Sequence, residues 1–238
     1  TDSNGCTVTI DFEVTEPEYL EASVVIVDAF CNGDLGSGEL IVTGGTAPYN
    51  YDLSSGSFDN LNTALLTAGT YTATVTDSNG CSVTLDFEIT EPELLEASVL
   101  VTDALCNGDF GSAELTITGG TAPYDTDDLS ALSAGTYSTT VTDSNGCTVT
   151  IDFEVTEPEQ LSLSFDSTPG EYSNCASGSA SVVVEGGTLD YEYLWSNGET
   201  TSEITALCSG EYFVTVTDIN GCEIEGSVFV EFLTPDGW

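Results

Sequence analysis

Short runs in which apolar and polar residues alternate recur along the whole chain, separated by residues that form turns. In the runs 69–76 and 82–89, every second residue is apolar. A period of two residues is typical of a β-strand with one face in a hydrophobic core. No window shows the period of an amphipathic helix, so the chain is predicted to be all-β.

An Asn-Gly pair between two alternating runs is a strong signal for a β-hairpin. Aligning the apolar faces places Val75 opposite Val83 and leaves a three-residue loop between Asp77 and Cys81. The third residue of such a loop adopts a left-handed backbone conformation, which suits Gly80. Asp77 is then predicted to anchor the turn, because its carboxylate can accept backbone N–H groups of the loop.

The same turn sequence recurs along the chain. Thr-Asp-Ser-Asn-Gly-Cys stands at 1–6, 76–81 and 142–147, and returns with one change at 217–222. Thr-Glu-Pro-Glu and Cys-Asn-Gly-Asp also recur, with a period of about 75 residues. The predicted segments are the last strand of a truncated preceding repeat (1–16), complete repeats at 17–91, 92–157 (shortened) and 158–233, and a tail at 234–238.

Within the first complete repeat, alternation predicts strands at 20–29, 38–43, 49–53, 69–76 and 81–90, with one or two short strands in the polar segment that ends at 62. This pattern favours a linear tandem array of small immunoglobulin-like β-sandwiches of the fibronectin III or PKD kind. A Tyr at the start of the strand that precedes the last hairpin turn resembles a tyrosine corner in each repeat, at Tyr71, Tyr137 and Tyr212.

Two repeats depart from the first in informative ways. In the repeat 92–157, the segment between Tyr124 and Ala134 is short, so the core of this repeat is predicted to be the weakest. In the repeat 158–233, Trp195 occupies the position where such sandwiches bury a tryptophan on their third strand.

The charge excludes several classes of partner. The 238 residues include 41 Asp and Glu but no Lys, Arg or His, which gives a net charge of −41. Nucleic-acid binding depends on basic residues, and anionic membranes would repel such a surface. No apolar run has the length of a membrane span, so neither a nucleic-acid partner nor direct membrane insertion is expected.

The composition also argues against an enzyme. Without His or Lys, the abundant Ser and Thr hydroxyls have no partner that would activate them. The carboxylate pairs on the outer face of the last strand of each repeat are predicted to be solvated, as is usual for antiparallel sheets. These pairs are Asp11/Glu13, Asp86/Glu88 and Asp152/Glu154.

Calcium is the candidate cofactor, because Asp, Asn and Glu oxygens are plentiful in the loops. The candidate ligands are Asp77, Asn79, Asp143, Asn145, Asp218 and Asn220, with Glu91 or Asp34 contributing across a joint. The alternative is that these Asp and Asn residues serve the turn. No Asp-x-Asp-x-Asp-Gly loop is present, which favours the alternative.

Eight cysteines without a Cys-x-x-Cys pair favour disulfides and therefore an oxidising compartment at the cell surface or outside the cell. Two pairings stay open. One joins the cysteines of each repeat, as Cys31–Cys81, Cys106–Cys147 and Cys175–Cys222. The other links successive repeats, as Cys31–Cys147, Cys106–Cys222 and Cys175–Cys208, with Cys6 and Cys81 paired upstream.

The second pairing is preferred for a topological reason. In an immunoglobulin-like sandwich, the turn after the first strand and the last hairpin turn lie at opposite ends. Cys31 and Cys81 would therefore be much farther apart than the Cα separation of about 7 Å that a disulfide allows. If repeats follow one another head to tail, these turns meet across each joint.

The repeated motifs together resemble the SprB-type repeat of giant surface adhesins of gliding bacteria. The matching words are Cys-Asn-Gly, Gly-Gly-Thr-Ala-Pro-Tyr, Leu-x-x-Gly-Thr-Tyr, Val-Thr-Asp-x-Asn-Gly-Cys and Thr-Glu-Pro. The resemblance implies a tandemly repeated extracellular stalk that is exported by type IX secretion and used in adhesion or gliding.

Two functions remain on the sequence. The chain is expected to be a structural stalk segment of an extracellular adhesin or surface filament, about 100–120 Å long for three repeats at about 3.3 Å per strand residue. The alternative is a carbohydrate- or ligand-binding accessory module of a secreted enzyme. Most Tyr and Phe occupy the alternating positions that face the core, whereas sugar-binding sites usually expose aromatic side chains, so the pattern favours the stalk. An open cleft lined by Tyr49, Tyr51 or Trp195 would favour the alternative.

The expected partners of the stalk follow from its repeats. They are the neighbouring repeats of the same chain, with lateral or head-to-tail self-association as a candidate. The chain begins inside a motif and is expected to be part of a longer polypeptide.

Overall fold

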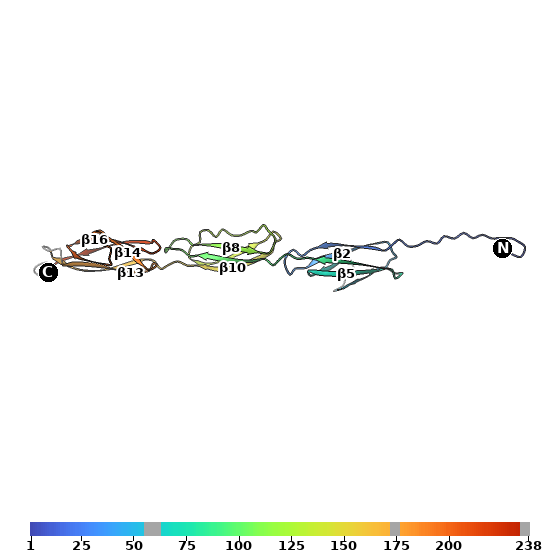
Figure 1. Ribbon diagram of the computed structural model, residues 1–238, viewed down its shortest axis with the longest axis horizontal. Helices are drawn as coiled ribbons and strands as arrows, with labels where there is room; N and C mark the ends of the chain where they lie inside the picture. Colours follow the sequence, from blue (N-terminus) through green and yellow to red (C-terminus); the bar gives the residue numbers. More distant parts are fainter. Residues whose placement is uncertain (55–62, 172–176, 234–238) are drawn as a thin grey trace. The chain divides into compact units, whose positions relative to one another are not determined.

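The computed structural model describes residues 1–54, 63–171 and 177–233. Strands are the regular secondary structure throughout this described part of the chain, and it contains no helix that could cross a membrane (Figure 1). The polar segment 55–62, Cys175 and the predicted tail lie outside the described residues. The all-β prediction is confirmed.

The first complete repeat is a sandwich of two three-stranded sheets, β1-β2-β4 and β3-β5-β6. Residues from both sheets, among them Leu40, Leu66, Val75 and Ile89, are buried together in one core. The strand bounds are β1 Glu21–Val27, β2 Gly36–Thr43, β3 Asn50–Leu53, β4 Thr63–Leu66, β5 Gly69–Thr76 and β6 Ser82–Ile89.

The β5–β6 hairpin has the predicted register, with Val75 opposite Val83. The Asp77 N–H donates to the Cys81 carbonyl oxygen at 2.9 Å and closes the loop. Gly80 has a φ of 86°, in the region where a side chain would be strained. The alternation of apolar residues and one glycine are therefore sufficient to determine this hairpin.

The second complete repeat has two two-stranded sheets, β7-β8 and β9-β10. Its buried cluster contains only Leu129, Leu132 and Val155 among the described residues, and a single bridge joins Gly111 to Leu132. This agrees with the predicted weak core. The strands are β7 Glu96–Thr102, β8 Ser112–Thr118, β9 Gly135–Thr142 and β10 Thr148–Val155.

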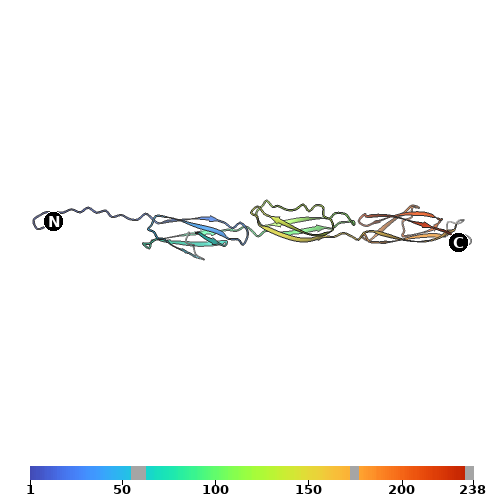
Figure 2. The ribbon, with the colours of Figure 1, turned by 180° about the vertical axis from the view of Figure 1, so that it is seen from behind.

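The last repeat again has two three-stranded sheets, β11-β13-β15 and β14-β16-β17, and a parallel pair, β12-β18. Both sheets are visible in orange and red in Figures 1 and 2. Trp195 lies in the core and is 2% exposed, as predicted. The strands are β11 Ser162–Thr168, β12 Gly170–Glu171, β13 Gly178–Glu185, β14 Tyr191–Trp195, β15 Glu203–Leu207, β16 Gly210–Asp218, β17 Glu223–Val230 and β18 Phe232–Leu233.

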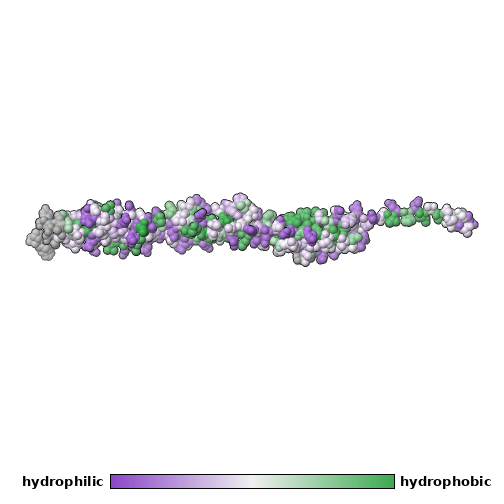
Figure 3. All heavy atoms as spheres, in the orientation of Figure 1, coloured by the Kyte–Doolittle hydropathy of each residue, from purple (hydrophilic) through white to green (hydrophobic). Residues whose placement is uncertain are grey.

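Two details differ from the sequence prediction. The sequence analysis did not predict strand β4 at Thr63–Leu66, whose Ala64 and Leu66 complete the core. The one or two short strands expected in the polar segment up to residue 62 lie mostly outside the described residues. The segment 7–16 forms no strand, since no described strand pairs with it. Its alternating apolar side chains, including Ile10 and Phe12, are more than three-quarters exposed. Figure 3 shows hydrophobic surface along this thin N-terminal segment.

The chain divides into two compact units, and the division does not follow the repeats. One unit contains Thr1–Glu96 with Thr118–Tyr124 and Thr142–Thr148, and the other contains Ala97–Ile117, Asp125–Val141 and Val149–Trp238. Two loops of the second repeat thus belong to the same unit as the first repeat. Each joint between consecutive repeats therefore lies within one compact unit.

Candidate functional site: the joints between repeats

The repeated turn is held by its Asp side chain. One carboxylate oxygen of Asp77, Oδ1, accepts the N–H groups of Asn79 and Cys81, both at 2.9 Å. The other, Oδ2, accepts the N–H of Thr46 at 3.0 Å and so connects the turn to the loop after β2. Asp143 and Asp218 make the same three contacts in the later repeats.

These contacts affect ionisation of the Asp side chains. Burial of the Asp77 carboxylate opposes ionisation, but the N–H groups of Cys81, Thr46, Asn79 and Gly80 outweigh it and lower the pKa of Asp77. The pKa values of Asp143 and Asp218 are lowered against burial in the same way, by backbone N–H groups of their own turns and of the neighbouring loop. All three are therefore ionised turn anchors at neutral pH.

The candidate calcium ligands do not converge. The Asp oxygens of the turns already accept backbone N–H groups, and the Asn79 side chain acts as a donor, to Thr46 Oγ1 at 2.9 Å. Glu91 accepts the Gly33 N–H. Among the described residues, no group of three or more Asp, Glu, His or Cys side chains gathers as a metal site would require. The turn interpretation accounts for the contacts of these residues.

At the first joint, three of the repeated sequence motifs contact one another. The Asn145 side-chain amide donates to the Phe30 carbonyl oxygen at 2.9 Å. The Glu91 carboxylate accepts the Gly33 N–H at 2.6 Å, and the Asn32 amide donates to the Pro92 carbonyl oxygen at 3.1 Å. Cys-Asn-Gly-Asp, Thr-Glu-Pro and the Asn-Gly-Cys turn are thus three parts of one contact.

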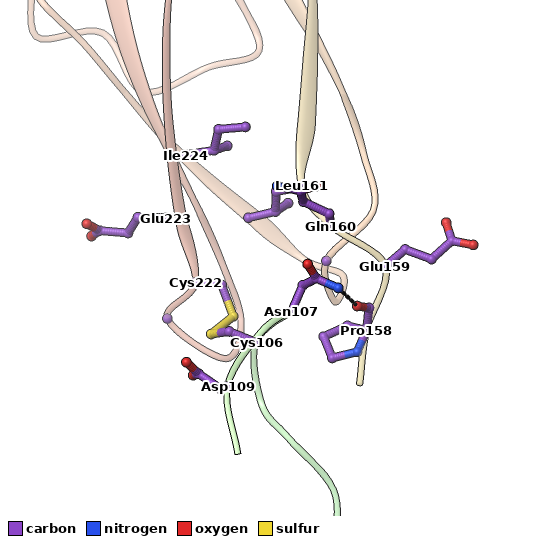
Figure 4. Close-up of a pocket in the computed structure, with 12 residues that line it drawn as sticks. Cys106, Asn107, Asp109, Pro158, Glu159, Gln160, Leu161, Cys222, Glu223 and Ile224 are labelled. Atoms are coloured by element: carbon purple, nitrogen blue, oxygen red, sulfur yellow. Dashed lines mark hydrogen bonds between the residues drawn. A yellow bond between two sulfur atoms is a disulfide. The ribbon is translucent and has the colours of Figure 1, made fainter. Parts of the chain in front are cut away.

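The second joint repeats these contacts. Asn220 donates to the Leu105 carbonyl oxygen at 3.0 Å. The Glu157 carboxylate accepts the Gly108 N–H at 2.6 Å. Asn107 donates to the Pro158 carbonyl oxygen at 3.1 Å, as Figure 4 shows. The same geometry at two places indicates that the motifs encode the joint.

A disulfide lies beside each set of hydrogen bonds. Cys31 pairs with Cys147 and Cys106 with Cys222, with Cα separations of 5.7 and 5.6 Å. These are the two pairs that the topological argument preferred, and pairing within one repeat is ruled out for Cys31 and Cys106. Cys208 is disulfide-bonded, and its expected partner Cys175 lies outside the described residues. Cys6 and Cys81 are free and exposed.

The paired glycines hold the segment that leads into the first strand of each complete repeat. Gly44 and Gly45 have φ values of 66° and 64°, and a side chain on Gly44 would collide with the Tyr19 carbonyl. This close approach allows the Gly45 N–H to donate to the Glu18 carbonyl oxygen at 2.9 Å. The same bond links Gly120 to Glu93 and Gly187 to Glu159. The sequence analysis did not assign this role, although the glycines recur together with Thr-Glu-Pro.

A cavity of about 370 Å³ lies beside the second joint. Its lining includes Leu161, Ile224 and three acidic residues, Asp109, Glu159 and Glu223. The three carboxylates point in different directions in Figure 4 and enclose no common centre. The cavity is a gap beside the joint and has no convergent polar groups of the kind that fix a small ligand.

The aromatic residues divide into two sets. The hydroxyls of Tyr71, Tyr137 and Tyr212 donate to carbonyl oxygens four residues upstream, at 2.8, 2.8 and 3.2 Å, which is the geometry of a tyrosine corner. The Tyr49 hydroxyl donates to Gly44 and Trp195 is buried, so neither is presented as a ligand platform.

Two aromatic residues of the last repeat are among those that do not face the core. Phe213 and Phe229 are more than half exposed on the outer face of β16 and β17. Their parity is opposite to that of Tyr212 and Val230, which face the core.

The solved structures that match this chain are distant in sequence. They include the N-terminal eight immunoglobulin domains of Down Syndrome Cell Adhesion Molecule (11% identity, TM-score 0.41, 90% of this chain, 36% of that chain). Another is the bacterial integrin-binding protein invasin (10% identity, TM-score 0.31, 90% of this chain, 60% of that chain). A third is the Bacteroides ovatus mixed-linkage glucan utilization locus protein SGBP-B (13%, TM-score 0.22, 93% and 72%).

This chain thus spans less than two thirds of the first and second of these proteins. A search of curated proteins finds no match to the sequence.

A protein-family model supports the resemblance seen in the motifs. The model described as SprB repeat matches residues 23–58, 98–125 and 174–200. One match falls in each of the three complete repeats, and the first two include the Cys-Asn-Gly-Asp loop that forms the joint. Each complete repeat of this chain therefore contains a segment that matches the SprB repeat model.

Proposed function

We propose that this chain is a stalk segment of an extracellular adhesin or surface filament and that it holds a distal part of the protein away from the cell. The observation that carries this proposal is the identity of the two joints. Each combines one disulfide with hydrogen bonds made by Glu, Asn and backbone groups. A repeated, specific joint is what a tandem array needs to keep a defined geometry between neighbours.

The disulfides would stiffen the stalk under tension. Each bridge closes a sequence separation of 116 residues across one joint. A joint held by hydrogen bonds alone would open under load, whereas a covalent bridge limits its extension. Disulfides are also common where small domains cannot build a large core.

The composition supports an extracellular location. Disulfides persist in oxidising compartments. Three segments match the SprB repeat model, and the motifs of the chain resemble the repeats of exported surface adhesins. A strongly acidic surface favours solubility and discourages non-specific association. The proposed role is structural, and export by type IX secretion and a contribution to gliding belong to the same proposal.

Small-angle scattering with and without a reductant tests the stalk. The expected result is an elongated particle of about 100–120 Å for three repeats, from the length of their strands at about 3.3 Å per residue. Reduction should broaden the distance distribution as the joints loosen. A compact particle under oxidising conditions would contradict the proposal.

Single-molecule stretching tests the mechanical role directly. The oxidised chain is expected to resist extension at both joints, and Cys147→Ser should release the first joint alone. Cys81→Ser is the matched control, because Cys81 occupies the same position in the turn but is free. Equal force–extension curves for Cys147→Ser and the unchanged protein would argue against a load-bearing bridge.

One observation favours a second candidate function, ligand binding by the last repeat. Leu194, Phe213 and Phe229 are each more than half exposed on the outer face of the sheet β14-β16-β17. Exposed aromatics on one sheet face suit stacking against a sugar ring. Glycan-array binding that is lost in Phe213→Ser but retained in Phe30→Ser, which alters another exposed Phe, would support this alternative.

A further inference from the structure

The first complete repeat carries the same joint-forming turn as the later repeats, but its cysteine is free. Cys81 corresponds to Cys147 and Cys222, which are bonded to cysteines of the preceding repeat. Asn79 corresponds to Asn145 and Asn220, each of which donates to the carbonyl oxygen just before that cysteine. Among the described residues, the Asn79 side chain makes only the contact with Thr46 that is common to all three turns.

The rest of this face is already assembled. Asp77 holds the turn and the Thr46 N–H, as Asp143 does for Thr121. The Glu18 carbonyl oxygen accepts the Gly45 N–H. The segment before the first strand is therefore held against the loop after β2, as the equivalent segments are at both joints. Glu16 and Pro17 are exposed and correspond to Glu91 and Pro92, which accept hydrogen bonds from an incoming loop.

We propose that Glu16, Pro17, Asn79 and Cys81 form a covalent docking face for the Cys-Asn-Gly-Asp loop of another SprB repeat. The Glu16 carboxylate accepts the N–H of the loop glycine, and the Pro17 carbonyl oxygen accepts the loop asparagine amide. The Asn79 amide donates to the carbonyl just before the loop cysteine. Cys81 forms a disulfide with that cysteine.

The chemistry of the face selects this partner. The face offers two acceptors, the Glu16 carboxylate and the Pro17 carbonyl oxygen, and one donor, the Asn79 amide. At the two joints, each Cys-Asn-Gly-Asp loop uses the complementary groups: its Gly N–H and Asn amide donate, and the carbonyl oxygen just before its Cys accepts. The loop needs no basic residue, which suits a chain without Lys or Arg. Both loops of this kind in the chain are already disulfide-bonded, so the partner loop comes from a further repeat.

The covalent step is a thiol–disulfide exchange. The Cys81 thiolate attacks a mixed disulfide between the loop cysteine and a small thiol, such as glutathione. The bond between Cys81 and the loop cysteine forms while the glutathione thiolate leaves. Oxidised glutathione, which makes that mixed disulfide, is the oxidant that accepts the two electrons.

An extended chain tests the pairing. A second copy of residues 17–75 placed before Thr1 completes a repeat with the segment 1–16 and supplies one additional Cys-Asn-Gly-Asp loop. After refolding in a glutathione buffer, non-reducing peptide mapping is expected to link the added loop cysteine to Cys81 and leave Cys6 free. A link between the added cysteine and Cys6, or a symmetric Cys81–Cys81 dimer, would overturn the proposal.

A peptide experiment on the unmodified chain keeps the proposal testable if the extended chain does not fold. The probe is a synthetic peptide with the sequence of residues 28–35, its cysteine activated as a mixed disulfide with 2-nitro-5-thiobenzoate. Cys6 is the internal control, because it has the same local turn without the loop that carries Thr46. Release of the coloured thiolate measures the exchange, and mass mapping assigns the site.

The expected result is exchange about tenfold faster at Cys81 than at Cys6, a factor that one or two hydrogen bonds can supply. Cystamine, which cannot make the loop contacts, provides the reference rates at the two cysteines. Glu16→Ala should reduce the preference, whereas Glu13→Ala, in the unpaired segment, should not. Equal rates for the peptide at both cysteines, after correction by the reference, would overturn the proposal.

Discussion

The second and last repeats stabilise similar sandwiches in different ways. The last repeat buries Trp195 with Ile204, Val214 and other apolar residues between two three-stranded sheets. The second repeat has only two-stranded sheets around Leu129, Leu132 and Val155. It nevertheless supplies one cysteine to each inter-repeat bridge, Cys147 to the first and Cys106 to the second.

The difference shows that a repeat can lose core residues when its ends are held. A small domain buries a modest fraction of its surface and is marginally stable alone. Cross-links at both ends reduce the conformational freedom of the unfolded chain. We therefore expect the second repeat to depend on its joints and the last repeat to depend mainly on its core.

Removal of both inter-repeat bridges should have the largest effect. Cys106→Ser with Cys147→Ser is expected to lower the stability of the second repeat by about 2–4 kcal/mol per bridge. Hydrogen exchange of the β9 and β10 amides measures this loss. Cys81→Ser is the control and should leave the exchange unchanged. Slower exchange in the second repeat than in the last, after both bridges are removed, would show that the comparison is wrong.

Core substitutions should affect the two repeats in the opposite order. Trp195→Ala is expected to cost about 3–5 kcal/mol, because it leaves a large cavity in a dense core. Leu132→Ala in the second repeat should cost about 2 kcal/mol, at the lower end for buried leucine, because its cluster of fully buried residues is small and the site can relax around the cavity. Urea denaturation followed by exchange in each repeat separates the effects. Equal costs would mean that the small core contributes as much as the large one.

Acid should loosen the turns at both joints. The folded pKa of Asp143 lies below its ordinary value. Its stabilising contribution is therefore fully present above the ordinary carboxyl pKa of about 4 and is lost as the pH falls through the lower folded value. The melting temperature should fall across that interval, and Asp143→Asn should reduce the dependence on pH. Asp152→Asn on β10 is the control, and the same flattening there would argue against the turn.

Loss of a single joint hydrogen bond should have the smallest effect. Asn145→Ala removes the contacts with Phe30 and Thr121 and is expected to cost about 1 kcal/mol. Asn79→Ala removes only the equivalent of the second contact and should cost less. Thermal unfolding of the two variants compares a turn that contacts the preceding repeat, at Asn145, with a turn that has no such contact in this chain, at Asn79. A larger cost for Asn79→Ala would contradict the assignment of Asn145 to the joint.

Much of the local structure was predictable from the sequence. The alternation around Asp77 and Gly80 determines the register of β5 and β6, because a shift by one residue would expose the entire apolar face. The Asn-Gly-Cys turn follows from the backbone preference of glycine and the acceptor capacity of Asp. The positions of the cysteines at opposite ends of a sandwich also indicate pairing across repeats.

The sequence did not reveal how the joint is made. Glu91 contacts Gly33 across 58 positions and Asn145 contacts Phe30 across 115, and no local pattern connects such residues. Strand 63–66 was not predicted, because its role depends on the sheet that it completes. The exposure of Phe213 and Phe229 likewise follows from the face on which their strands were placed.

One physical cause separates the features that the sequence predicted from those that only the tertiary structure showed. Turn geometry, strand periodicity and the spacing of motifs depend on neighbouring residues, so the sequence alone determined the sandwich repeats and their hairpins. The joint depends on groups that only approach each other after two repeats have folded. Only the tertiary structure therefore showed that three motifs separate in the sequence come together in one contact. These motifs are Cys-Asn-Gly-Asp, Thr-Glu-Pro and Asn-Gly-Cys.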